Sequence, residues 1–236
     1  MNTLRRTLLT NLLFVTLFAW SPAAEAEWVT IFDGKNLSGW KSNDETPNCF
    51  TVEKGKLKVS GGRAHLFYAG DGDSEPSIKN FELKLRVMTT PQANSGVYFH
   101  TTYQAEGWPS AGFECQVNST QKDPKKTGSL YAVSNVLVLK EGQKIPPGSL
   151  ADRVVEKAPS TDGEWFDYHI KVVNREVTLR VNGEITTQWT QPKNFDPATA
   201  LKNNPNRKLG AGTFAIQAHD PDSTTYYQNI RLKVLD

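Results

Sequence analysis

A short segment of alternating residues carries the polar groups best suited to chemistry. In residues 113–118 an extended strand turns its apolar side chains towards a core and places three polar ones on the opposite face: Glu114, Gln116 and Asn118. Successive members of this row lie about 6.6 Å apart, because each strand residue advances about 3.3 Å. Tyr98 and His100, in the preceding strand, are expected on the same face. One sheet then presents a carboxylate, amides, a phenol and an imidazole.

A second polar row lies near the C-terminus. Gln217 and His219 alternate with apolar residues, and Asp220 follows directly in the loop. A carboxylate beside an imidazole can hold a divalent cation or make the imidazole a base. The alternative is that both rows are the solvent-facing side of an antiparallel sheet. The residue types favour the first interpretation, since Glu, Gln and Asn beside Tyr and His resemble a sugar-binding surface.

Motifs for several other chemistries are missing from the sequence. It contains no nucleophile elbow, no HExxH, no phosphate-binding glycine loop and no cysteine pair with zinc spacing. The common route of glycoside hydrolysis needs two carboxylates across the scissile bond, whereas the strand at 113–118 supplies only Glu114. That route is therefore disfavoured, and a second acid contributed by a loop stays open as an alternative.

Strands must position these side chains, because apolar and polar residues alternate along residues 27–236 and helical periodicity is almost absent. Asn182-Gly183 adds a type I′ hairpin signal. The clearest runs cover residues 50–59, 64–68, 80–90, 96–100, 113–118, 166–172, 177–181, 213–219 and 226–235. Ten or more strands in one domain predict an all-β fold of two stacked antiparallel sheets, a β-sandwich or jelly roll.

Two segments interrupt the alternation. Residues 140–163 contain Pro146-Pro147 and a short helix expected near Asp152, and residues 191–212 are rich in Asn and Pro. Long loops on a β scaffold often border the binding face. We therefore expect both loops near the site.

The first 26 residues are typical of a secretory signal. Arg5 and Arg6 precede an apolar run from Leu8 to Trp20, and a small-x-small tripeptide ends at Ala26. The run is too short for a membrane span, which needs roughly 20 residues, and no later stretch is apolar enough for one. The sequence predicts cleavage after Ala26 and one exported domain, periplasmic or extracellular, over residues 27–236.

Charge and cysteine content narrow the class of partner. The formal net charge of +2 includes two arginines of the signal, so the remaining domain is nearly neutral, and no basic stripe indicates nucleic acid. The two cysteines, Cys49 and Cys115, permit one disulfide in an oxidising compartment, which a domain of this size does not require.

Several segments together resemble one family, the 3-keto-disaccharide hydrolases. These are concanavalin-like jelly rolls, also described as 3-keto-glucoside lyases and 3-keto-2-hydroxyglucal hydratases. The resemblance runs along nearly all of the mature chain, from WVTIFDGKNLSGWK at 28–41 through NSGVYFH at 94–100 and GFECQVN at 112–118 to GTFAIQAHDPDSTTYYQNIRLKVL at 212–235. The chain departs from the family pattern at Phe113, where Tyr is common, and at Gln228, where Arg is common.

The resemblance implies a hydrolase or lyase that acts on 3-keto glycosides. A ketone at C3 acidifies the hydrogen at C2, so one base can remove it, and the resulting enediolate expels the glycosidic oxygen from C1 before water adds. The resemblance implies Glu114 and His219 as the base or as ligands of a divalent metal ion, with no organic cofactor. The residues it implies as substrate contacts are Tyr98, His100, Gln116, Asn118, Lys126, Tyr131, Gln217 and Asp220.

Two other functions fit the same residues. A non-catalytic carbohydrate-binding module would use the polar face together with aromatic residues such as Trp108, and a scaffold domain would bind no sugar. If the protein is the hydrolase, its substrate must first be oxidised, so the resemblance also implies a separate sugar 3-dehydrogenase in the same compartment.

Overall fold

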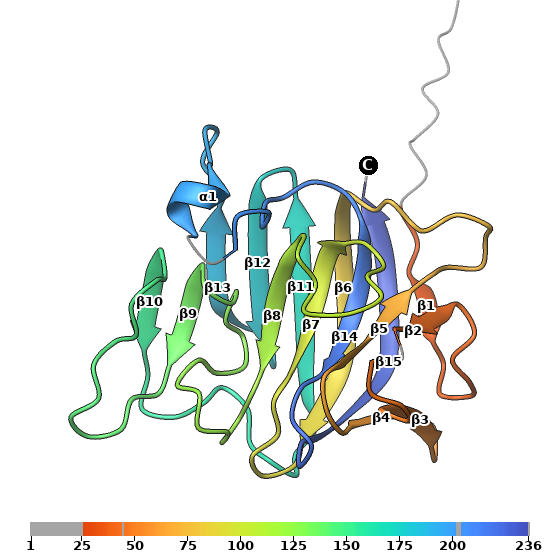
Figure 1. Cartoon of the computed structure of the whole chain (residues 1–236), viewed down its shortest axis with the longest axis horizontal. Helices are drawn as coiled ribbons and strands as arrows, with labels where there is room; N and C mark the ends of the chain where they lie inside the picture. Colours follow the sequence, from red (N-terminus) through yellow and green to blue (C-terminus); the bar gives the residue numbers. More distant parts are fainter. Residues whose placement is uncertain (1–25, 44, 202–203, 236) are drawn as a thin grey trace, which may run out of the picture.

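Two β-sheets are stacked face to face in the computed structural model, which describes residues 26–43, 45–201 and 204–235 (Figure 1). The larger sheet runs in the order β13 (Glu184–Thr190), β12 (Glu176–Val181), β11 (Phe166–Val173), β6 (Asn80–Thr89), β15 (Thr224–Leu235), β4 (Lys56–Ser60) and β3 (Phe50–Glu53), and β1 (Val29–Phe32) also pairs with β15. The smaller sheet has the order β2 (Trp40–Ser42), β5 (Ala64–Tyr68), β14 (Thr213–Ala218), β7 (Ser95–Thr101) and β8 (Phe113–Val117).

The core lies between the two sheets and is built from alternate residues of each strand. Phe81, on β6, packs edge to face against Phe99 and Phe214 of the smaller sheet, with ring centroids 5.7 and 4.9 Å apart. The apolar residues of β8 join the same cluster, so Phe113 and Cys115 are fully buried. Burial of one face of each sheet leaves the opposite face of β8 for polar side chains, as alternation predicts. The β-sandwich prediction is confirmed.

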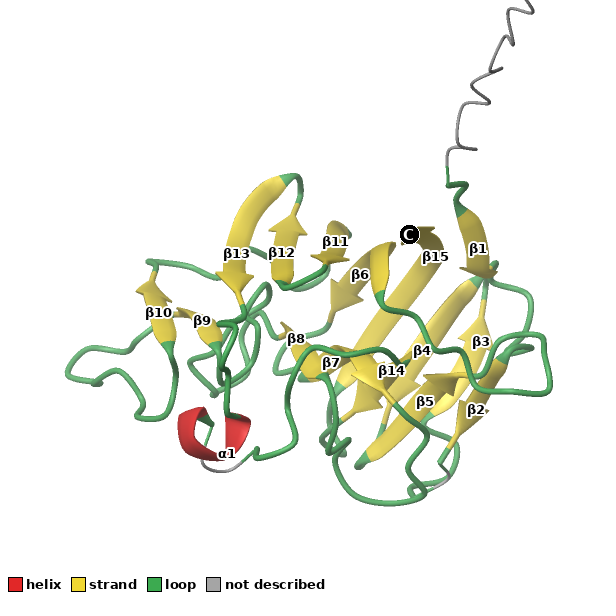
Figure 2. Ribbon diagram, turned by 90° about the horizontal axis from the view of Figure 1, so that it is seen from above, coloured by secondary structure: helices red, strands yellow, loops and turns green. Residues whose placement is uncertain are grey.

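Smaller elements gather at one end of the molecule (Figure 2). They are β9 (Ser134–Leu137), β10 (Ala151–Val154) and the one-turn helix α1 (Pro197–Ala200). The pair β9–β10 is parallel, whereas the pairs within both large sheets are antiparallel. The helix expected near Asp152 is wrong, because Asp152 lies in β10. The described helix starts instead after Asp196, whose carboxylate accepts a hydrogen bond of 3.1 Å from the Ala198 amide.

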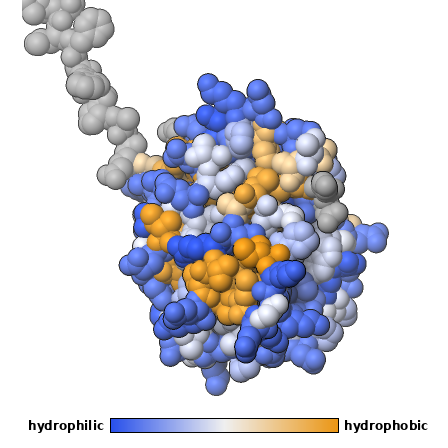
Figure 3. Space-filling view, turned by 90° about the vertical axis from the view of Figure 1, so that its left-hand side faces the viewer, coloured by the Kyte–Doolittle hydropathy of each residue, from blue (hydrophilic) through white to orange (hydrophobic). Residues whose placement is uncertain are grey.

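The same end of the molecule carries an apolar patch surrounded by hydrophilic side chains (Figure 3). Exposed apolar side chains in this region include Ile145 in the long loop, and Leu150 and Val154 at β10. The 140–163 segment thus contributes apolar side chains to the molecular surface rather than to the core.

The predicted signal segment up to Glu25 lies outside the described residues. In the part of the chain that the structure describes, no helix is long and apolar enough to cross a membrane. Cys49 and Cys115 are both buried and unpaired, so the described fold is held without the disulfide that the sequence permits.

Candidate functional site

A cavity of about 250 Å³ lies on the face of the smaller sheet that is turned away from the core, and we call it the polar cavity. Six residues predicted from the sequence line it: Tyr98, Glu114, Gln116, Tyr131, Gln217 and His219. Five further residues complete the lining: Asn94, Trp108, Asp123, Asn204 and Arg207. Of these, only Trp108 was named from the sequence, as an aromatic contact of the carbohydrate-binding alternative. The alternation of β7, β8 and β14 therefore brings residues far apart in the chain to one place.

Glu114 is the centre of the hydrogen-bonded groups in this cavity. The Tyr98 hydroxyl donates to Glu114 Oε2 at 2.8 Å, and Gln217 Nε2 donates to Glu114 Oε1 at 3.3 Å. Gln217 Nε2 also lies 3.2 Å from the Tyr98 hydroxyl. These bonds come from three adjacent strands, so the orientation of the carboxylate is fixed by the sheet itself.

The Glu114 side chain extends from β8 across Gly96 of β7. A Cβ atom at Gly96 would lie only 2.7 Å from Glu114 Oε1 and 2.9 Å from Glu114 Cγ. Glycine within a strand often marks a close approach of this kind. Gly96 therefore provides the space through which Glu114 reaches Gln217.

Arg207 brings a buried positive charge to the carboxylate. Its Nη2 lies 3.9 Å from Glu114 Oε2, and only 5% of the residue is exposed. Its Nε and Nη1 atoms have no hydrogen-bond partner among the described residues. An arginine keeps its charge in proteins, and a buried charge with unused donors is costly unless a further acceptor binds. Arg207 is thus suited to a ligand oxygen that carries negative charge.

The electrostatic environment of Glu114 favours a base that binds a proton readily. Burial raises the pKa of Glu114 above its ordinary value, while the Arg207 charge and the Tyr98 hydrogen bond act in the opposite direction. Burial and the neighbouring Glu114 carboxylate raise the pKa of Tyr98 well above its usual range, so this hydroxyl stays protonated and keeps donating. The carboxylate is thereby held ready as a proton acceptor.

Two amide oxygens in the cavity have unused hydrogen-bonding capacity. Gln116 Nε2 donates to Asn94 Oδ1 at 2.8 Å, but Gln116 Oε1 has no partner in the described structure. The same holds for Oε1 of Gln217. Buried acceptors normally have donors, so this pattern suits a ligand with several hydroxyl groups.

His219 closes one side of the cavity together with Trp108. The two rings lie 4.8 Å apart with an interplanar angle of 33°, and His219 Nδ1 lies 2.8 Å from Asp220 Oδ1. Asp220 does not itself line the polar cavity, so its contact with the site runs through His219. The loop that carries Trp108 is attached by a hydrogen bond of 3.0 Å from the Gly107 amide to Glu45. His219 and Glu114 line one cavity.

The expectation that His100 shares a face with Tyr98 is wrong. His100 lies opposite a register shift between β7 and β14 and has a φ of 55°, a left-handed conformation that interrupts the alternation of the strand. Its ring packs against Phe81 and Phe99, and its Nε2 lies 2.8 Å from the Lys79 carbonyl oxygen. His100 therefore belongs to the packing around this β-bulge.

Asn118 and Lys126 lie beneath the loop that follows β8 and do not line the cavity. Lys126 Nζ donates to the Gln121 carbonyl at 2.6 Å and lies 3.3 Å from Asn118 Oδ1. The neighbouring Lys125 contacts the cavity wall instead, since its Nζ lies 3.5 Å from the Tyr131 hydroxyl. Lys126 was predicted as a substrate contact, but its neighbour Lys125 is the lysine of this loop that approaches the cavity.

The two departures from the family pattern do not alter the cavity. Phe113 points into the core, where it packs against Trp189 with ring centroids 5.6 Å apart. Gln228 pairs with Arg86 in the larger sheet and does not line the polar cavity.

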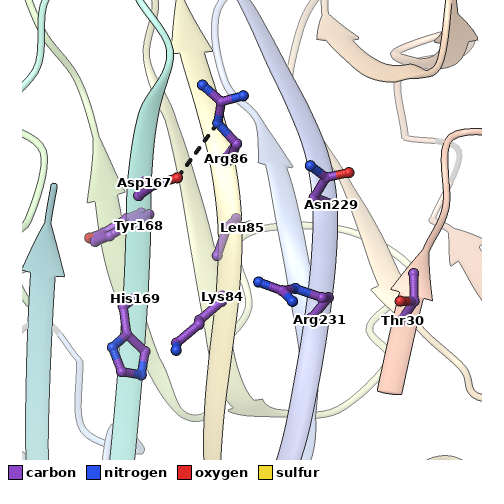
Figure 4. A pocket seen from close by; sticks show the side chains of 9 residues that line it. All are labelled: Thr30, Lys84, Leu85, Arg86, Asp167, Tyr168, His169, Asn229 and Arg231. Carbon is purple, nitrogen blue, oxygen red and sulfur yellow. Dashed lines mark ion pairs between the residues drawn. The ribbon is translucent and has the colours of Figure 1, made fainter. Parts of the chain in front are cut away.

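A second hollow, the outer cavity, lies on the outer face of the larger sheet and has a volume of about 480 Å³ (Figure 4). Its charged side chains extend along neighbouring strands, and Arg86 forms an ion pair of 3.5 Å with Asp167. Because none of the predicted site residues lies there, the polar cavity is the better candidate for chemistry.

The carboxylates and imidazole of the polar cavity are not gathered into one metal-binding group. Among residues 26–43, 45–201 and 204–235, no three His, Cys, Asp or Glu side chains come together as a metal-binding group.

Comparison with known proteins assigns the chain to a family. Residues 27–233 match the model of the 3-keto-alpha-glucoside-1,2-lyase-like domain. The chain belongs to this family. A relative from Bacteroides thetaiotaomicron named 3-keto-disaccharide hydrolase is 28% identical over 243 residues, which cover 89% of this chain and 79% of the relative.

Solved structures support the fold. A proposed glycosyl hydrolase from Parabacteroides distasonis superposes with a TM-score of 0.62 at 20% identity, covering 89% of this chain and 94% of that one. The exoplasmic/lumenal domain of VIP36 reaches a TM-score of 0.54 at 6% identity, with 88% of each chain covered. The sandwich is therefore shared with proteins of very different sequence, whereas the family match covers nearly the whole domain.

Proposed function

We propose that this protein is a 3-keto-disaccharide hydrolase that cleaves its substrate by elimination followed by hydration. The observation that carries the proposal is the pair at the centre of the polar cavity, a buried carboxylate whose pKa is raised and a buried arginine with unused donors 3.9 Å away. A base and a cation in that arrangement suit removal of a proton next to a ketone. The family match and the name of the Bacteroides relative support the same substrate class.

In the first step the Glu114 carboxylate removes the C2 proton. The electrons of the C2–H bond form a C2–C3 double bond, and the C3 oxygen becomes an enolate. Arg207 stabilises the negative charge on this oxygen through donors that have no partner in the described residues. Gln116 and Gln217 accept hydrogen bonds from the sugar hydroxyls and orient the ring.

In the second step the enolate expels the leaving group. The C3 ketone re-forms, a C1–C2 double bond appears, and the C1–O bond breaks. Tyr131 is the proposed proton donor to the departing oxygen, because it lines the cavity and, against the raising effect of burial, the Lys125 ammonium 3.5 Å from its hydroxyl lowers the pKa of that hydroxyl. Water then adds its oxygen to C1 and gives one proton back to the Tyr131 phenolate, while C2 regains a proton from the acid form of Glu114. The product is the free 3-keto sugar, and both side chains return to their starting protonation states.

The position of Asp123 favours a second candidate function, direct hydrolysis of an unoxidised glycoside. Asp123 lines the polar cavity with Glu114, so the cavity offers the second acid that direct hydrolysis of an unoxidised glycoside would need. Its carboxylate lies 3.5 Å from Lys125 Nζ and accepts a hydrogen bond from the Lys125 amide at 3.0 Å. These contacts suit a role in holding the loop, which is why we favour elimination.

The two routes are separated by substrate and by variant. We expect the protein to cleave a 3-keto disaccharide and to leave the unoxidised disaccharide intact. Glu114→Gln should lower kcat/KM by about a thousand-fold, within the range for loss of a general base, while Asp123→Asn should lower it less than ten-fold. Cleavage of the unoxidised sugar, together with a large loss in Asp123→Asn, would establish direct hydrolysis instead.

The same assay tests the remaining expectations. We propose that activity survives dialysis against a chelator, since the route needs no metal, and strong inhibition would restore the metal hypothesis for Glu114 and His219. We also propose that the protein is exported after cleavage behind Ala26 and acts downstream of a sugar 3-dehydrogenase. N-terminal sequencing of the secreted protein checks the first of these statements.

A further inference from the structure

A further cavity adjoins the polar cavity and has about 550 Å³, and we call it the loop cavity. Tyr131 and Asn204 line both cavities, so the two spaces meet at these side chains. The polar cavity is less than half as large as this neighbour. A ligand that fills the polar cavity can therefore continue past Tyr131 into a larger space.

The walls of the loop cavity come from the two long loops that interrupt the strand pattern. Pro147 lies in the loop between β9 and β10, and Ala200 and Leu201 lie at the end of α1. These side chains are apolar, whereas Lys125 and Ser149 add polar groups to the lining. The lining thus offers apolar side chains and polar groups in similar measure, which suits a ring that has an apolar face and a polar edge.

The charge of this lining is already balanced. Lys125 Nζ lies 3.5 Å from Asp123 Oδ1 and 4.7 Å from the centre of the Tyr131 ring. Its charge is therefore shared between a carboxylate and an aromatic face. A neutral ligand fits this lining better than an anion, which would compete with Asp123.

We infer that the loop cavity binds the leaving group of the substrate, as a neutral ring with an apolar face. This inference rests on the proposed function, in which the C2 atom lies at Glu114. Because C1 is bonded to C2, the leaving group begins within two bonds of that atom, and Tyr131 stands where the two cavities meet. The ring is a second sugar or an aromatic aglycone, and both share the chemistry that the wall recognises.

The test uses three substrates that differ only in the leaving group. These are methyl 3-keto-glucoside, 4-nitrophenyl 3-keto-glucoside and a 3-keto disaccharide. Ala200→Trp places a large side chain in the loop cavity, and Ala198→Trp is the control, since Ala198 lies on the same helix, is exposed and does not line the cavity. Pro147→Ala removes part of the wall and serves as an independent variant if the tryptophan disturbs folding.

We expect Ala200→Trp to lower kcat/KM about ten-fold or more for ring leaving groups, with less than a two-fold change for the methyl glycoside. Pro147→Ala should lower kcat/KM a few-fold for the two substrates with ring leaving groups. Ala198→Trp should leave kcat/KM unchanged for all three substrates. A fall in kcat/KM for the disaccharide alone would identify a second sugar as the ring that the cavity binds. A fall for the 4-nitrophenyl glycoside alone would identify an aromatic aglycone. Equal effects on all three substrates in both variants would overturn the inference. Failure of the unmodified protein to cleave any 3-keto glycoside would instead overturn the proposed function.

Discussion

Arg207 influences the reaction through the protonation of Glu114 as well as through the substrate. Its charge lowers the pKa of the carboxylate, in opposition to the larger effect of burial. In Arg207→Ala the pKa of Glu114 should rise, so the base becomes protonated at a higher pH. We expect the acidic limb of the kcat/KM profile to move to higher pH, with activity falling most at the acid end. A pH–rate series on the unmodified protein and the variant measures this shift.

Arg207→Lys is the matched comparison, because it keeps a positive charge without the planar donor group. In this variant the acidic limb should lie close to its position in the unmodified protein, while the maximum kcat/KM stays low. A uniform loss in Arg207→Ala, with the limb unmoved, would mean that Arg207 acts on the substrate alone.

Sequence reasoning at this scale succeeded wherever a residue lies within a regular strand. Glu114, Gln116 and Gln217 share a face because strand residues alternate with a period of two. His100 was misplaced because one left-handed residue ends that alternation. Arg207 lies in a loop without periodicity, so the long loop could be predicted to border the site, but the residue that enters it could not.

At the scale of elements, the contact between β7 and β8 depends on one missing side chain. Gly96→Ala would put a Cβ 2.7 Å from Glu114 Oε1 and 2.9 Å from its Cγ, so the Glu114 side chain must leave its present position. Because the clash is with a side chain, we expect the fold to persist while kcat/KM falls on the order of 100-fold, as for a small misplacement of a catalytic group.

Gly72→Ala is the control, since a Cβ at Gly72 would meet no atom within 4 Å. Thermal unfolding and kinetics of the two variants separate position from stability. If Gly96→Ala kept full activity, the gap in β7 would not be what positions Glu114.

Elements with a clear period were predicted and the irregular ones were not. The strands around 80–90 and 113–118 follow directly from alternation. The bulge in β7 is different, because it depends on Gly112 and Gly212, where added Cβ atoms would lie 2.0 Å and 2.3 Å from the Phe99 and Thr101 carbonyl oxygens. Such packing is a property of the assembled sheet. The parallel pairing of β9 with β10 likewise depends on how the long loop returns.

For the whole molecule, His65 makes stability depend on pH. Its ring is fully buried between Tyr98 and Trp108, at 5.6 Å from each, and burial lowers its pKa from 6.5 to about 4. Between pH 6.5 and pH 4 the unfolded chain therefore binds a proton at His65 that the folded protein does not bind. Folding stability should fall as the pH drops from 6.5 towards 4, by about 3 kcal/mol in total.

Urea unfolding at several pH values measures this loss. His65→Phe keeps an aromatic ring of similar size, and neither ring nitrogen of His65 has a hydrogen-bond partner in the described structure. The variant should therefore lose less stability between pH 6.5 and 4 than the unmodified protein does. Parallel curves for the two proteins would show that other groups dominate the acid response.

The two-sheet architecture was predictable from alternation, whereas the strand order was not. Alternation reports which face of a strand is buried, and it carries no information on which strand lies next to it. The placement of β15 between β6 and β4 thus required the structure.

That placement bears on how the protein is made. β6 is paired with β15, which lies well over a hundred residues later in the chain, along nearly its whole length. During synthesis the larger sheet lacks a central strand until β15 has emerged, and such distant pairings form slowly. The larger sheet should accordingly not assemble until β15 has left the ribosome, however early β6 is made.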